Sequence, residues 1–144
     1  MKPDCIIIHH SLTEDNKTVS WGAIRDYHIN VKKWNDIGYN WGIELIGERY
    51  EILKGRMDNE EGAHCIGFND HSIGICLVGN FDFIEPNSTQ MSVLRKLVLS
   101  LMEIHNIPKM NVFGHWETYG LRNRPPEKSC PGNAFSMFSF RHTL

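Results

Sequence analysis

Short, uninterrupted apolar runs alternate with amphipathic segments along this chain, and this alternation constrains its fold more than any other feature. The run Cys5 to Ile8 is typical of a strand buried on both faces, and Ser72 to Val78 predicts a second one. Met110 to Phe113 predicts a shorter strand. Trp41 to Ile46 and Tyr50 to Leu53 flank a glycine-containing loop, which indicates a hairpin. The chain therefore carries enough strands for a sheet.

Three further segments have the residue spacing of helices. Apolar and aromatic residues recur every three or four positions from Thr18 to Trp34, with Ser20 or Thr18 as the N-cap. The strongest pattern runs from Ser88 to Asn106 between two prolines, and a short one from Ala134 to Arg141 follows the capping residue Asn133. Because strands and helices alternate, we expect an α/β fold: a single domain with a central mixed β-sheet flanked by helices.

Length and composition predict one domain over residues 1–144 and argue against several kinds of partner. Apolar residues make up 41% of the 144 residues and charged residues 22%, which are ordinary values for a globular domain. The 15 basic and 17 acidic residues give a formal charge of −2, which is no electrostatic signature for nucleic acid or an anionic membrane. Apolar stretches also fall short of the roughly 18 residues of a membrane span. We expect no nucleic acid and no membrane as partner.

The N-terminus and the cysteines indicate where the chain is made. The first residues lead directly into the strand-like run at Cys5, without the longer apolar segment and cleavage site of a signal peptide. Four scattered cysteines are too few for a disulfide framework in a chain of this length, so we expect reduced thiols. Both observations predict synthesis in the cytoplasm without a signal peptide.

Histidines at predicted strand ends and one loop cysteine are the first candidates for chemistry. His9 or His10 follows the first strand, His115 follows a later one, and Cys130 lies in a proline-rich loop. Strand ends of an open α/β sheet meet at one crevice, where two imidazoles and a thiolate suit zinc and leave one position for water. The spacing alone favours hydrogen-bonded cleft residues over a zinc site, because it contains no familiar metal-binding motif.

Several short sequence blocks span residues 6 to 132. They are Ile6 to Ser11, Asp36 to Asn40, His64 to Asn69, Ser72 to Phe81, Gly114 to Glu117 and Lys128 to Gly132. In this order they resemble the zinc-dependent N-acetylmuramoyl-L-alanine amidases. That superfamily includes the amidase-type bacteriophage lysozymes and the peptidoglycan recognition proteins. Any one block is a weak signal, whereas their common order is a strong one.

The resemblance implies a Zn²⁺ cofactor and assigns its ligands. The first histidine of the strand-end pair matches the family's first ligand, so the resemblance places the metal on His9 rather than His10. His115 matches the second ligand and Cys130 the third. Glu117 either orients a ligand histidine or is an exposed acid.

The resemblance also implies three residues that act on the substrate. Tyr39 matches the family's catalytic tyrosine, and Lys128 matches the polar or basic catalytic residue of the phage enzymes. His64 matches a position that faces the groove, so we expect it to contact substrate. The segment Thr118 to Glu127 is longer than its counterpart in the phage lysozymes, so the assignment of Lys128 depends on its short distance to Cys130 in the sequence.

These assignments predict an enzyme that hydrolyses the amide bond between N-acetylmuramic acid and L-alanine in peptidoglycan. We expect a monomeric phage or prophage endolysin that reaches the cell wall after release through a separate pore protein. One alternative is a cytoplasmic amidase that recycles small muropeptides. Another is a non-catalytic peptidoglycan-binding module, which the complete ligand set argues against. A regulatory protein partner stays open.

Overall fold

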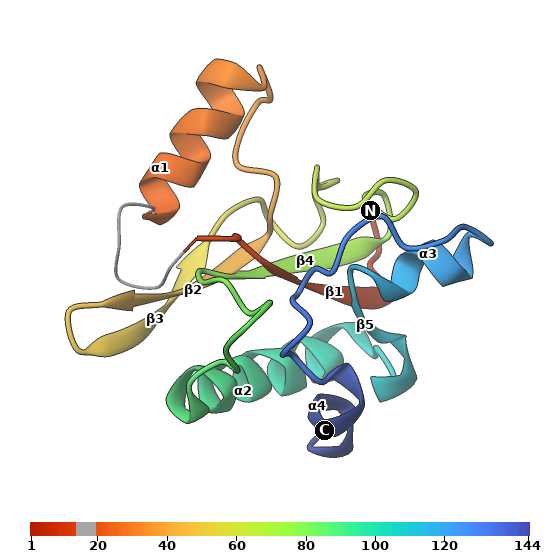
Figure 1. Ribbon diagram of the computed structural model, residues 1–144. Coiled ribbons are helices and arrows are strands. Elements are labelled where there is room, and N and C mark those ends of the chain that lie inside the picture. Colours follow the sequence, from red (N-terminus) through yellow and green to blue (C-terminus); the bar gives the residue numbers. More distant parts are fainter. Residues whose placement is uncertain (14–19) are drawn as a thin grey trace.

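The computed structural model describes residues 1–13 and 20–144 and is built around a five-stranded mixed sheet with the order β3-β2-β4-β1-β5 (Figure 1). Strands β2, β4, β1 and β5 run parallel to their neighbours, and β3 pairs antiparallel with β2 at one edge. The strands are β1 Cys5–His10, β2 Trp41–Ile46, β3 Arg49–Lys54, β4 Ser72–Leu77 and β5 Val112–Gly114. The helices are α1 Trp21–Asp26, α2 Ser88–His105, α3 Glu117–Leu121 and α4 Met137–His142, with a π-helical turn Tyr27–Val31 and a 3-10 turn Lys109–Asn111.

The apolar runs predicted as strands form the centre of the sheet. Every residue of β1 and of β4 is buried, as expected for strands that carry structure on both faces. The first strand extends beyond Ile8, so that His9 and His10 are themselves its last two residues. Alternate residues point to opposite faces, which sends these two histidines into different surroundings.

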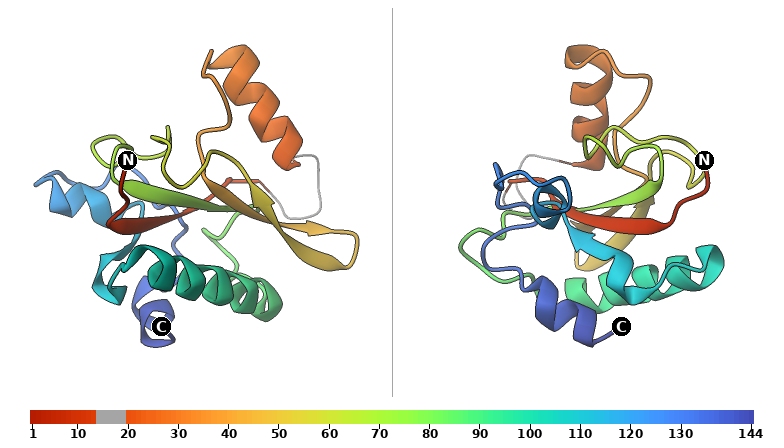
Figure 2. Two further views of the ribbon diagram at one scale, coloured as in Figure 1. Left: turned by 180° about the vertical axis from the view of Figure 1, so that it is seen from behind. Right: turned by 90° about the vertical axis from the view of Figure 1, so that its right-hand side faces the viewer.

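Helices α2 and α4 cover one face of the sheet, and α1 lies on the other (Figures 1 and 2). The main core fills the space between the sheet and α2 and α4, where Ile6 and Ile8 pack with Leu94, Val98 and Phe140. A smaller core on the α1 side contains Trp21, Ile37 and Cys76. No helix within the described residues is long and apolar enough to cross a lipid bilayer.

Helix α2 follows its sequence pattern closely. Asn87 caps its first turn by accepting a hydrogen bond from the Thr89 backbone, and Asn106 ends it in the left-handed conformation with φ of 56°. Ile104, which the spacing places on the buried face, is 67% exposed, so the buried apolar stripe of α2 ends at Leu101.

The helix predicted from Thr18 to Trp34 is shorter in the structure. Ser20 caps α1 by accepting a hydrogen bond from Ala23, while Thr18 lies outside the described residues. The α-helix changes to a π-helical turn at Tyr27 and ends at Val31, before Trp34. Lys33 has a positive φ of 61°, so the chain cannot continue as a right-handed helix there.

The C-terminal third differs most from the sequence prediction. Helix α3 lies between the last predicted strand and Cys130, where the sequence pattern predicts no helix, because five residues are too few to show a helical period. Helix α4 begins at Met137 and is capped by Ser136, so the prediction of a start at Ala134 with Asn133 as the cap was wrong. The backbone N–H of Ala134 instead donates to the carbonyl of Phe81, which keeps this residue outside the helix.

Candidate active site

Two histidines and one cysteine meet at the carboxyl end of the sheet. His9 lies in β1, His115 directly follows β5, and Cys130 belongs to the loop before α4. Their potential ligand atoms all lie within 4.8 Å of one another, and all three residues are buried. The Sγ atom of Cys130 is 3.6 Å from Nδ1 of His9. Parallel pairing of β1 with β5 brings the two histidines to the same end of the sheet.

The strand pleat separates the paired histidines, as the family resemblance requires. His9 points toward His115 and Tyr39, with ring centroids 4.6 Å and 5.2 Å away. The Nδ1 atom of His10 accepts a hydrogen bond of 3.1 Å from the Phe81 backbone, away from the cluster. His10 is therefore a structural residue that fixes the turn after β4.

The cluster has the donor set that zinc requires, and the separation between two of its donors also fits zinc. Zn–N bonds of about 2.0–2.1 Å and Zn–S bonds of about 2.3 Å give a tetrahedral N–S separation of about 3.6 Å. The observed distance between His9 and Cys130 agrees with that value. Three protein donors also leave the fourth tetrahedral position free, the arrangement of catalytic rather than structural zinc sites.

Burial puts both imidazoles in the neutral form that ligates metal. It lowers the pKa of His9 well below the usual range and that of His115 to about 4. Burial also raises the pKa of the Cys130 thiol to about 12, although nearby Lys128 acts in the opposite direction. A divalent cation between these groups would hold the thiolate, because coordination to a metal deprotonates a thiol outright.

Tyr39 lies beside the cluster and is held there by the neighbouring loop. The side chain of Asn40 accepts a hydrogen bond from Gly74 of β4, and the Asn40 backbone donates to the Gly74 carbonyl. A Cβ atom on Gly38 would be 2.3 Å from the carbonyl oxygen of Ala63, so the close approach of these loops requires glycine. Burial raises the pKa of Tyr39 well above 10, which keeps its hydroxyl protonated and able to donate.

His64 contacts the cluster directly. Its Nδ1 atom is 3.0 Å from Nε2 of His9, and its Nε2 atom is 3.4 Å from the hydroxyl of Ser72. Burial lowers the pKa of His64 to about 3, so its ring is neutral. One side of the ring also faces a cavity beside the cluster.

That cavity has a volume of about 550 Å³ and is strongly cationic. His64 and His115 form part of its wall, and Lys128 stands on its rim with an exposed side chain. Lys32, Arg122 and Arg124 add three more cationic side chains, against the single carboxylate of Glu127. The cavity therefore suits an anionic ligand whose reacting atoms lie next to the histidines.

The loop that carries Cys130 is fixed by residues that the sequence analysis did not select. The hydroxyl of Ser129 and the backbone of Asn133 both donate to one carboxylate oxygen of Asp82, at 2.6 Å and 3.2 Å. The Trp116 backbone donates to the carbonyl of Cys130 at 2.8 Å. These contacts join segments far apart in sequence, so no local pattern could have predicted them.

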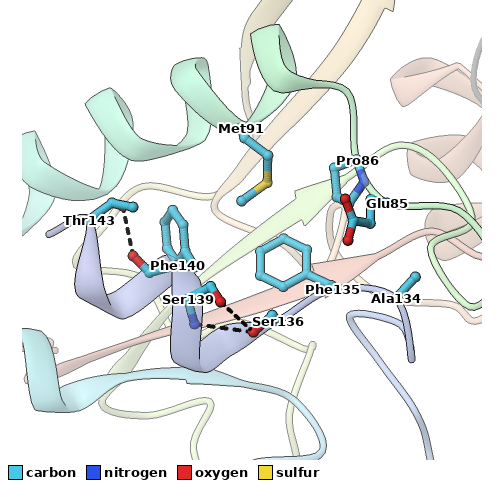
Figure 3. A pocket seen from close by; sticks show the side chains of 9 residues that line it. All are labelled: Glu85, Pro86, Met91, Ala134, Phe135, Ser136, Ser139, Phe140 and Thr143. Atoms are coloured by element: carbon cyan, nitrogen blue, oxygen red, sulfur yellow. Dashed lines mark hydrogen bonds between the residues drawn. The ribbon is translucent and has the colours of Figure 1, made fainter.

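A second cavity, of about 220 Å³, lies between α2 and α4 (Figure 3). Met91, Phe135 and Phe140 form much of its wall, and Glu85 is the only charged side chain among the residues that line it. This cavity has no imidazole, thiol or amine to take part in a reaction.

Glu117 anchors the end of β5 and does not contact the ring of a ligand histidine. Its carboxylate accepts a hydrogen bond from the Gly114 backbone at 2.8 Å and two from Arg141 at 2.7 Å and 2.8 Å. Both side chains are largely shielded from solvent. The interaction ties α4 to the residue that precedes His115.

Glu117→Gln is therefore expected to lower the free energy of unfolding by about 1.5–3 kcal/mol, the range for hydrogen bonds to charged groups. Urea denaturation of the variant measures the loss. Glu103→Gln, at an exposed position of α2, serves as the matched control and should change little. Equal stability of Glu117→Gln and the wild type would show that the ion pair contributes nothing.

The fold and the cluster together define a class: α/β proteins with three potential metal ligands at the carboxyl end of a mixed sheet, beside a cationic cavity. The chain belongs to the N-acetylmuramoyl-L-alanine amidase family, whose model matches residues 1–133. The predicted resemblance is thereby confirmed.

Individual relatives include both enzymes and recognition proteins. The endolysin of Escherichia phage T7 is 36% identical over 104 residues, which are 69% of this chain and 66% of that protein. Peptidoglycan-recognition protein 2 of Holotrichia diomphalia is 36% identical over 103 residues, which are 68% of this chain and 54% of that protein. The chain thus spans between about half and two thirds of the length of these curated relatives.

Solved structures confirm the predicted single-domain α/β fold. The endolysin amidase LysCS from Clostridium intestinale URNW has a TM-score of 0.80 at 29% identity, over 99% of this chain and 84% of its own. A Drosophila PGRP-LB mutant in complex with tracheal cytotoxin has a TM-score of 0.75 at 28% identity, over 94% of this chain and 79% of its own.

Proposed function

We propose that residues 1–144 form a single zinc amidase domain that hydrolyses the bond between N-acetylmuramic acid and L-alanine in peptidoglycan. The observation that carries the proposal is the buried group His9, His115 and Cys130, with donor atoms within 4.8 Å of one another, of which His115 lines a cationic cavity. The three residues are the proposed zinc ligands. Peptide stems of peptidoglycan carry carboxylates, which suit the cationic side chains around the cavity.

In the proposed reaction, water adds to the lactyl carbonyl and the carbon–nitrogen bond breaks. The products are a free lactyl carboxylate and a peptide with a new L-alanine amino terminus, which takes up a proton. A zinc ion held by His9, His115 and Cys130 would act as a Lewis acid, which would polarise the carbonyl and make water a better nucleophile. The ammonium group of Lys128 stabilises the negative charge that develops on the carbonyl oxygen. The hydroxyl of Tyr39 orients the attacking water or donates to the same oxygen.

The biological setting that we propose is phage or prophage lysis. The similarity to the T7 endolysin supports it, and the similarity to a PGRP-LB mutant in complex with tracheal cytotoxin supports peptidoglycan or a muropeptide as the ligand. The protein would act as a monomer, made in the cytoplasm and released to the wall through a separate pore protein. A muropeptide-recycling amidase would use the same site on smaller substrates.

Purified sacculi and soluble muropeptides test the activity and the setting together. With zinc present, we expect new N-terminal L-alanine from sacculi, loss of this release with a chelator, and recovery when zinc is added back. Release from muropeptides alone would favour the recycling enzyme. Zinc binding without release of L-alanine from either substrate would favour a recognition module. Absence of both zinc binding and L-alanine release would contradict the proposal.

Tyr39→Phe is expected to lower kcat by about 10²-fold or more, the usual contribution of a group that assists proton transfer. KM and zinc content should stay close to the wild type, because the ring still packs beside His9 and only the hydroxyl is lost. Steady-state release of L-alanine gives both constants.

Tyr50→Phe, which removes a hydroxyl from β3 at the sheet edge, is the matched control and should keep its kcat. If Tyr39→Phe turned over at the wild-type rate, the hydroxyl would have no part in the mechanism.

A further inference from the structure

The second ring nitrogen of His9 has a specific partner. Nδ1 of His9 faces Cys130 and the rest of the cluster, whereas Nε2 points to Nδ1 of His64 at 3.0 Å. We propose that His64 is a positioning residue, which fixes the tautomer and the ring orientation of His9 for metal binding. This inference rests on the metal centre proposed above and gives His64 a role other than contact with substrate.

The positions of the hydrogens along this contact follow from the chemistry of the groups. To bind a metal through Nδ1, His9 must carry its proton on Nε2, and that proton can only be donated to His64 Nδ1. His64 then carries its own proton on Nε2, where the hydroxyl of Ser72 lies 3.4 Å away. Ser72 in turn donates to the carbonyl of Phe68 at 2.6 Å.

These hydrogen bonds therefore all donate in one direction, from the metal ligand His9 toward the backbone carbonyl of Phe68. A backbone carbonyl can only accept, so the Ser72 hydroxyl must donate to it and is left with its lone pairs for His64. The opposite tautomer would place a proton on His9 Nδ1, at the position that faces Cys130. Because the Phe68 carbonyl fixes the direction of these hydrogen bonds, it selects the His9 tautomer that leaves Nδ1 free to bind the metal.

The surrounding backbone holds the His64 ring rigidly in this position. A Cβ atom on Gly74 would be 2.6 Å from the ring, and one on Gly62 would be 2.5 Å from it. The side chain of Asn69 accepts hydrogen bonds from the backbones of His64 and Cys65, at 2.9 Å and 2.8 Å. The two glycines and the Asn69 amide thus restrict the His64 ring to one position. A residue that orients a metal ligand requires such a fixed position.

Two substitutions of His64 separate the hydrogen bond from the packing. His64→Asn places an amide oxygen near the position of Nδ1, so it can still accept from His9. His64→Leu keeps a side chain of similar bulk but accepts nothing, and leaves the buried Nε2–H of His9 without a partner. Ser72→Ala acts one step further out, by removing the hydroxyl beside His64 Nε2 while leaving the Ser72 backbone, which also contacts His64, in place.

The readout is the zinc dissociation constant, measured by competition with a chromogenic chelator on the full chain. The visible spectrum of the Co²⁺-substituted protein reports the ligand geometry independently of activity. We expect His64→Leu to bind zinc about 10–100-fold more weakly, the usual cost of losing an outer-shell partner. His64→Asn should stay near the wild-type affinity, and Ser72→Ala should fall between the two. Circular dichroism of the metal-free proteins checks that each variant is folded.

Each alternative outcome has a distinct meaning. Wild-type zinc affinity and an unchanged Co²⁺ spectrum in His64→Leu would overturn the inference and leave the proposed amidase intact. Equal losses in His64→Leu and His64→Asn, with Ser72→Ala unaffected, would also overturn it, because packing alone would then explain the effect. A wild-type protein that binds no zinc would overturn the metal centre itself.

Discussion

Cys130→Ser is expected to lose stoichiometric zinc and all measurable release of L-alanine while staying folded. The change replaces a sulfur donor by a hydroxyl that is not ionised near neutral pH, and so removes one of three protein ligands. The loss of zinc affinity should exceed the roughly 10–100-fold cost of losing an outer-shell partner. Metal analysis after gel filtration and the sacculus assay measure the two effects.

The fold should survive because other contacts hold this loop. Ser129 and Asn133 reach Asp82, and the Trp116 backbone reaches the carbonyl of residue 130, which the substitution leaves in place. Circular dichroism should therefore match the wild type. Hydrolysis of peptidoglycan by Cys130→Ser at the wild-type rate would refute the ligand assignment.

Cys5→Ser is the matched control for this experiment. Cys5 belongs to a second group that could hold a metal, with Asp4 and His71, at the opposite end of β1. Its thiol donates to the carbonyl of His71 at 3.8 Å, and Asp4 is exposed. We expect one zinc per chain in both the wild type and Cys5→Ser. Two zinc ions in the wild type and one in Cys5→Ser would show that this second group also binds metal.

The strands could be predicted from the sequence because burial on both faces leaves an uninterrupted apolar run. Cys5 to Ile8 and Ser72 to Val78 became the two fully buried central strands. Parallel strands then bring polar residues at their carboxyl ends together, which explains why the sequence alone predicts that His9 or His10 shares a crevice with His115.

Other parts of the site depend on contacts that leave no local pattern. The spacing does not predict that Cys130 lies beside β1. In the structure, the carboxylate of Asp82 and the turn at Trp116 hold the loop that carries Cys130 in this place. The family resemblance, rather than the spacing, selected Cys130 as a ligand. Likewise, the family resemblance places His64 in a groove, but only the structure shows its ring against Nε2 of His9.

Lys128→Ala is expected to lower kcat by about 10²–10³-fold, the cost of removing one donor from a developing oxyanion. Zinc content should be unchanged, because Lys128 is not one of the three donors. The side chain is exposed in the free protein, where water and salt screen its charge. A substrate that fills the cavity displaces that water, so the ammonium group acts most strongly when the reacting carbonyl lies beside it.

The free protein already shows that this charge reaches the cluster. After burial, the positive charge of Lys128 is the next largest cause of the lowered pKa of His115, and it also lowers the pKa of His9. Lys96→Ala, at an exposed position of α2 on the other face of the sheet, removes an equal charge and should leave kcat unchanged. A raised KM with the wild-type kcat would instead make Lys128 a binding residue for the anionic peptide. Loss of zinc from Lys128→Ala would make it a structural support of the metal site, because an oxyanion donor acts only once substrate is bound.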